Sequence, residues 1–174
     1  MATKKSMMVL FGVLVISSWV LGSANQSVAA TMKCRTAGTI TKSESIPVSD
    51  EEGHTLNLQI LQGLAFFDNG EIAKLRSHVI SDTIPQKGGQ AITYQIYTFE
   101  GGSTIVCRNM RLMVAGESGK PGTAKVTSEL IKGTGRFEGI KGTASATGKN
   151  FPGSGDEATR TTNEFTFTYT LPSK

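Results

Sequence analysis

The 174-residue chain is poor in the side chains on which most enzyme centres depend, with two histidines, two cysteines and one tryptophan. His54 and His78 lie in different settings, so they predict neither a metal site nor a Ser–His pair. No Cys-x-x-Cys, Gly-x-Ser-x-Gly or phosphate-binding glycine loop occurs, which leaves thiol redox, serine-hydrolase and nucleotide chemistry without support. The sequence therefore predicts no metal and no cofactor, and it leaves any catalytic residue unknown.

Long apolar runs are absent except near the start of the chain. Lys4 and Lys5 precede an apolar stretch of 15 residues at 7–21, and small residues follow up to Ala30. This order is typical of a secretory signal peptide, because a helix of this length spans only about 22 Å, short of a roughly 30 Å bilayer core. We predict a signal peptide at 1–30 and one domain at 31–174, exported to the periplasm or secreted, and not embedded in a membrane after cleavage.

The excess of positive charge is small. Removing Lys4 and Lys5 with the signal peptide lowers the net charge from +4 to +2. No basic run is left in the mature chain, so nucleic acid is not an expected partner.

Cys34 and Cys107 are the only cysteines. An even number of cysteines in an exported chain predicts a disulfide, and this one would close a long loop worth roughly 4 kcal/mol in the chain-entropy model. The alternative is a pair of separate buried thiols.

Sustained helical periodicity is also missing. Thr, Val, Ile and aromatic residues alternate with polar ones between glycine-rich turns, which is typical of an all-β fold. Many short strands between such turns are typical of a sandwich or a barrel, and eight strands closing on themselves would leave no exposed sheet edge. Of the two we predict an eight-stranded antiparallel β-barrel, on the resemblance that the glycine turn motif at 133–139 shows below. The expected strands are 34–46, 54–68, 71–84, 90–100, 103–115, 123–132, 142–149 and 163–171.

A first hairpin is expected at Asn69-Gly70, with a two-residue turn that pairs Asp68 with Glu71 and Phe66 with Ala73. That register sorts the two strands into an apolar and a polar face. The predicted interior set is Leu56, Leu58, Ile60, Leu64, Phe66, Ala73, Leu75 and Val79, and the predicted outer set is Asn57, Gln59, Lys74, Arg76, His78 and Asp82.

A second hairpin is expected at Gly101-Gly102, pairing Tyr97 with Val106 and Gln95 with Arg108. Both faces of this hairpin are partly apolar, which indicates a homo-oligomer contact on its outer side or else ordinary surface residues. If the Arg108 face is inward, Arg108 places a fixed cation in an apolar cavity, suited to a carboxylate or an oxyanion. The candidate ligand-binding residues are Arg108, Tyr97, Gln95 and Tyr169.

The most distinctive stretch is the glycine turn motif Gly133-Thr134-Gly135-Arg136-Phe137-Glu138-Gly139. Clustered glycines between strands mark tight turns or close backbone approach, and Phe137 among them would plug one end of the core. The motif resembles the Gly-Gly-x-Gly-x-Phe-x-Gly segment of the allene oxide cyclase and dirigent superfamily, with Lys132 in place of one glycine. The resemblance covers mainly residues 90–149.

The resemblance implies a barrel whose cavity holds an apolar or reactive intermediate, often within an oligomer. Our first hypothesis is a barrel that binds a small apolar or amphipathic molecule, since small barrels can enclose one such ligand. The alternatives are a cyclase or isomerase that steers a bound intermediate, and a structural or interaction barrel whose core is filled by residues such as Phe66, Phe165, Phe167 and Leu64.

Overall fold

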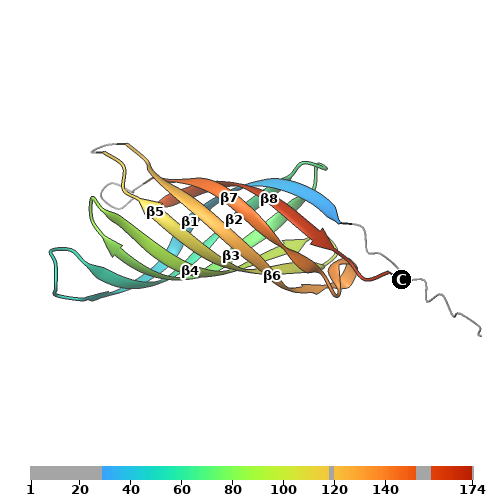
Figure 1. The fold of residues 1–174 in the computed structure, drawn as a ribbon, viewed down its shortest axis with the longest axis horizontal. Helices are drawn as coiled ribbons and strands as arrows, with labels where there is room; N and C mark the ends of the chain where they lie inside the picture. The colour runs from blue at the N-terminus through green and yellow to red at the C-terminus, as the bar shows by residue number, and fades with distance from the viewer. Residues whose placement is uncertain (1–28, 118–119, 152–157, 174) are drawn as a thin grey trace, which may run out of the picture.

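The computed structural model describes residues 29–117, 120–151 and 158–173. Each strand within them pairs antiparallel with its neighbours in the chain, and the first also pairs with the last, so the sheet closes into a barrel (Figure 1). The predicted eight-stranded antiparallel barrel is confirmed. Its elements are β1 (Ala30–Pro47), β2 (Thr55–Phe67), β3 (Ile72–Ile84), β4 (Gly88–Phe99), β5 (Thr104–Val114), β6 (Gly122–Thr134), the 3-10 helix η1 (Gly135–Phe137), β7 (Lys141–Phe151) and β8 (Arg160–Thr170).

The two ends of the barrel differ in their connections (Figure 1). The β1–β2 loop at 48–54 and the β3–β4 turn at 85–87 lie at one end, which we call the loop end. The short β2–β3 and β4–β5 hairpins and η1 lie at the other, which we call the plugged end. The predicted signal peptide falls almost wholly on residues 1–28, outside the described residues. No helix in the described part of the chain is long and apolar enough to cross a membrane.

The first hairpin loop is one residue longer than predicted. The backbone N–H of Phe67 donates to the carbonyl of Glu71, which leaves residues 68–70 as the loop. Gly70 has a φ of 86°, the left-handed conformation that commonly ends a three-residue hairpin loop. The predicted two-residue turn, with Asp68 facing Glu71, is therefore wrong.

The second hairpin differs from the prediction in the same way. The backbone N–H of Phe99 donates to the carbonyl of Ser103, so the loop comprises residues 100–102. Gly101 and Gly102 both have positive φ, 81° and 84°. Such a conformation strains any residue with a side chain, which explains the two adjacent glycines.

Each extra loop residue shifts the partner strand by one position, and in a pleated strand such a shift exchanges the two faces. Ala65 rather than Phe66 faces Ala73, and Ile105 rather than Val106 faces Tyr97. The predicted interior set is therefore correct for β3 and wrong for β2. Four residues of that set are exposed: Leu56, Leu58, Leu64 and Phe66.

The core lies in the plugged half of the barrel and is largely aromatic. Phe67 packs on Phe99 with ring centroids 4.9 Å apart, and Phe99 packs on Phe137 at 4.9 Å. Tyr97 meets Phe167 edge-on at 5.7 Å. The inward residues of β8, Phe165 and Phe167, belong to the same cluster, so the interior is filled at this end.

The glycine turn motif closes the plugged end, and the prediction that Phe137 plugs the core is confirmed. Phe137 is 6% exposed and sits in η1, between glycines with left-handed backbone at Gly135 (φ 61°) and Gly139 (φ 73°). A Cβ at Gly133 would lie 2.0 Å from the Phe137 carbonyl oxygen. A side chain does not fit at position 133, because the backbone of Phe137 lies too close.

We predict that Gly133→Ala destabilises the fold by more than 2 kcal/mol, because the added methyl group would displace backbone atoms that seat Phe137. Gly70→Ala is the matched control: nothing lies within 4 Å of its Cβ position, so only backbone strain of about 1 kcal/mol opposes the change. Urea unfolding followed by circular dichroism measures both variants. Equal losses of stability would contradict the crowding argument.

Candidate functional site

A cavity of about 230 Å³ occupies the loop half of the barrel interior. Asn57 and Gln59 were predicted to face outward. The shifted register of β2 turns both inward, and they belong to the lining of this cavity. Where the cavity meets the core, Leu75 and Phe165 form an apolar floor. The barrel is therefore not completely filled. Apolar surface toward the loop end comes from Ile40, Val79, Ala91 and Met113. The remaining side chains toward that end are polar: Asn57, Gln59, Ser77, Ser81, Thr83, Thr93, Gln95, Asn109, Arg111, Asn150, Thr159, Thr161 and Asn163.

Arg111 is the one ionisable side chain in the described lining of this cavity. Its guanidinium donates to Asn163 Oδ1 at 2.9 Å and to Asn150 Oδ1 at 2.6 Å. Burial lowers the pKa of Arg111 to about 10, so the group stays protonated at neutral pH. The cavity thus holds a positive charge that donates hydrogen bonds to neutral amides.

A chain of polar side chains runs from the cavity into the core. Asn109 Nδ2 donates to Gln95 Oε1 at 2.7 Å, and Gln95 Nε2 donates to Tyr97 Oη at 2.7 Å. Asn109 is 3% exposed, and its Oδ1 has no hydrogen-bond partner in the described structure. An unpaired buried acceptor is costly, so this oxygen is suited to a donor within the cavity.

The predicted ligand-binding residues do not meet at one place. Arg108 lies on the outer face, 54% exposed, and pairs with Glu129 at 2.8 Å; its conditional placement inside the cavity is wrong because of the three-residue loop. Gln95 lines the cavity, whereas Tyr97 lies below it in the core. Tyr169 packs against the core near the plugged end, opposite Gly142 on β7.

Sequence reasoning missed Arg111, Asn150 and Asn163. A one-residue longer loop in the second hairpin would have turned Arg111 inward with Asn109 and away from Arg108. The sequence carried no decisive indication of that loop length, because Gly101-Gly102 suits a two-residue and a three-residue loop alike. The asparagines on β7 and β8 carried no local pattern, since only barrel closure brings them to Arg111.

The predicted disulfide is wrong in this structure, because Cys34 and Cys107 are both free and buried. Burial raises the pKa of each thiol to about 12. The two residues point into the core from β1 and β5, close to Tyr97, whose pKa burial also raises well above its ordinary value. Neutral thiols in this setting act as small apolar core groups.

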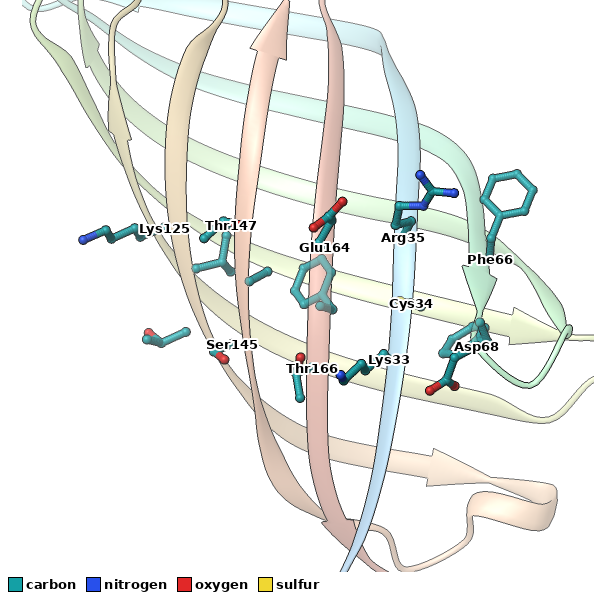
Figure 2. A pocket seen from close by; sticks show the side chains of 15 residues that line it. Lys33, Cys34, Arg35, Phe66, Asp68, Lys125, Ser145, Thr147, Glu164 and Thr166 are labelled. Carbon is teal, nitrogen blue, oxygen red and sulfur yellow. The ribbon is translucent and has the colours of Figure 1, made fainter.

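A larger hollow of about 830 Å³ lies along the strands β1, β6, β7 and β8 and the end of β2. Its labelled side chains are spread along the sheet and are not directed at one point (Figure 2). Exposed charges of opposite sign, Arg35 and Glu164, occupy paired positions on it. Solvated charges of mixed sign recognise no ligand in particular, so the interior cavity is the better candidate site.

His54 fastens the β1–β2 loop at the loop end. Its Nδ1 lies 2.5 Å from Asp50 Oδ1 within the loop, and its Nε2 lies 2.7 Å from Asp82 Oδ1 on β3. Lys87 pairs with Glu51 beside it. No group of three or more metal-ligating side chains suited to an ion occurs in the described residues.

Comparison with known proteins gives a likeness in architecture. No protein-family model matches the chain, and no curated protein matches it. Among solved structures it is similar to the pterocarpan synthase dirigent protein GePTS1, with 12% identity and a TM-score of 0.49 over 84% of this chain and 93% of that one. It is also similar to the pterocarpan synthase dirigent protein PsPTS1, with 13% identity and a TM-score of 0.48 over 85% of this chain and 99% of that one.

These likenesses concern the course of the backbone in a β-barrel.

We predict that His54→Gln removes a pH-dependent part of the stability. Hydrogen bonds that the His54 ring donates to Asp82 and then to Asp50 raise the pKa of His54 above 6.5. The protonated ring therefore stabilises the fold fully below that ordinary value, and this stabilisation is lost as pH rises through the higher folded pKa. Thermal unfolding between about pH 5 and pH 9 should show the loss in the parent protein but not in His54→Gln. His78→Gln, at the other histidine, is the control and should keep the parent profile.

Proposed function

We propose that this protein is an exported barrel that binds one small amphipathic molecule in its cavity. The observation that carries the proposal is the cavity itself, with polar side chains around Arg111 in its upper part and an apolar floor at Leu75 and Phe165. A molecule with one polar and one apolar end matches this division. The basic and apolar leader at residues 1–30 supports action in the periplasm or outside the cell.

The size of the cavity restricts the ligand. At about 230 Å³ it is smaller than the roughly 300–1,000 Å³ of pockets that take drug-sized molecules. A single ring or a short chain with a polar head fits this space. Lipids with long acyl chains do not match it.

Binding is favoured over acid–base catalysis by the chemistry of the lining. Arg111 is the sole ionisable group among the described lining residues, and its pKa of about 10 is far from neutral pH. General acid–base catalysis works best with a group that titrates near the working pH. An isomerase or cyclase would have to act here by confinement and charge stabilisation alone.

We predict that Ala91→Trp abolishes ligand binding. Ala91 is 3% exposed and lines the cavity, so an indole ring there would occupy the space of the ligand. Gln90→Trp is the matched control, because the adjacent Gln90 points outward and is exposed.

Native mass spectrometry of each protein, secreted by its own host, is the measurement. The parent and Gln90→Trp should carry a co-purified small molecule, and Ala91→Trp should not. If the parent shows only the mass of the polypeptide in repeated preparations, the binding proposal is contradicted.

We further propose that the outer face of β2–β5 binds a second copy of this chain. Leu58, Ile80, Ile92 and Met110 occupy paired positions across these four strands and are 39–57% exposed. With Leu56, Tyr94, Leu112 and Val114 they form what we call the apolar outer face.

The composition of this face supports a second copy as its occupant. Its eight apolar residues are each 39–64% exposed and lie on four adjacent strands, and contiguous exposed apolar patches mark interaction surfaces. A row in register across four strands is also self-complementary, because a two-fold axis brings the same row onto itself.

We predict that Ile80→Lys reduces the mass of the particle in solution to that of one chain. A lysine at the centre of the apolar outer face would have to be desolvated on association, which opposes it. Thr166→Lys, on the polar outer face of β8, is the control and should leave the assembly intact. Light scattering at micromolar concentration measures the mass. A parent protein with the mass of one chain would contradict the proposal.

A further inference from the structure

The charge in the cavity has no counter-ion among the described residues. Arg111 donates to two amide oxygens, and no described carboxylate lines the space around it. Arg111 is half-buried, and a partly desolvated charge is stabilised by an opposite charge beside it. The described lining of the cavity therefore carries one positive charge and no negative charge.

Arg111 has N–H groups left over that could bind the missing negative charge. A guanidinium has five N–H groups in a planar fork. One bond to Asn163 and one to Asn150 account for two of them. These two bonds also hold the fork between β7 and β8, so its remaining N–H groups are preorganised for a planar anion.

An unpaired acceptor lies on the same strand. Asn109 Oδ1 is buried without a partner, while the Nδ2 of the same amide is used by Gln95. Asn109 and Arg111 are two residues apart and both line the cavity, which separates their backbone positions by roughly 6.6 Å. The cavity thus offers a cation and, about one strand repeat deeper, an acceptor that lacks a donor.

We propose that the ligand is a small monocarboxylate that carries a hydroxyl group, with the carboxylate on Arg111 and the hydroxyl donating to Asn109 Oδ1. The inference rests on the proposed function and specifies the chemistry of the same site. A single guanidinium neutralises one carboxylate and matches its planar shape. A phosphate carries a second negative charge, and the described lining has no second cation to neutralise it.

The test uses three probes of nearly equal shape. 4-(Hydroxymethyl)benzoate has the carboxylate and the hydroxyl at opposite ends of one ring. 4-(Hydroxymethyl)benzamide replaces the charge by a neutral amide, and 4-methylbenzoate removes the hydroxyl donor. Isothermal titration calorimetry with the folded full-domain protein, freed of any co-purified ligand, measures each affinity.

The parent protein should bind the hydroxy acid at least tenfold more tightly than either analogue, since each analogue leaves one buried group unpaired. Arg111→Gln should weaken binding of the hydroxy acid by roughly tenfold to a hundredfold and leave the benzamide unchanged. Arg111→Lys keeps the charge without the fork and should fall between the two. Arg108→Gln, at the outward arginine of the same strand, should bind like the parent.

Asn109→Asp tests the second contact with a group of the same shape. A carboxylate there places a negative charge beside the ligand and should weaken the two acids more than the benzamide. Melting temperatures of all variants show whether each is folded. A folded variant that keeps the parent affinities would refute the role assigned to that residue.

Two outcomes separate this inference from the proposed function. If the acid and the benzamide bind equally, or if Arg111→Gln keeps the preference for the acid, the inference fails while binding in the cavity stands. If the parent binds none of the three probes but carries another co-purified molecule, the inference also fails and the proposed function stands. If nothing binds and the parent mass is bare, both fail.

Discussion

The closure of a pleated sheet on itself is the constraint on which the rest of this structure depends. In a closed barrel every strand has two partners, so the register of one hairpin decides which side chains of the next strand point inward. Two three-residue loops set that register here, at residues 68–70 and 100–102. The first loop turns Asn57 and Gln59 into the barrel, and the second turns Arg111 into it and Arg108 out of it. The chemistry of the interior follows from these two registers.

The interior is divided between an apolar and a polar half. At the plugged end, aromatic rings, two neutral thiols and the glycine turn motif fill the space and exclude water. At the loop end, asparagines and hydroxyl groups surround one cation. Stability is concentrated in the first half, which leaves the second free to hold an unpaired charge and an unpaired acceptor. Polar groups of this kind are tolerated in a fold when a ligand satisfies them.

The outer surface shows a matching division. Leu58, Ile80, Ile92 and Met110 align across β2–β5, whereas threonine, serine and lysine dominate the outer positions of β6–β8. The inner faces of β2 to β5 change along their length: they meet the apolar core at the plugged end and line the polar cavity at the loop end. The apolar row therefore lies on the outside of the strand segments that line the cavity, where it is available to a second copy of the chain.

Local pattern determined the number of strands, their approximate bounds and the plug at Phe137, because alternation and glycine turns act over a few residues. The choice of a barrel over a sandwich followed from the resemblance of the glycine turn motif. The faces of β2 and β5 were not determined in this way, since one loop residue more or less inverts them and Asn-Gly and Gly-Gly suit both loop lengths. Arg111, Asn150 and Asn163 are far apart in the chain. Only the closed barrel brings them together, and so only the tertiary structure decided where the buried charge lies and what it contacts.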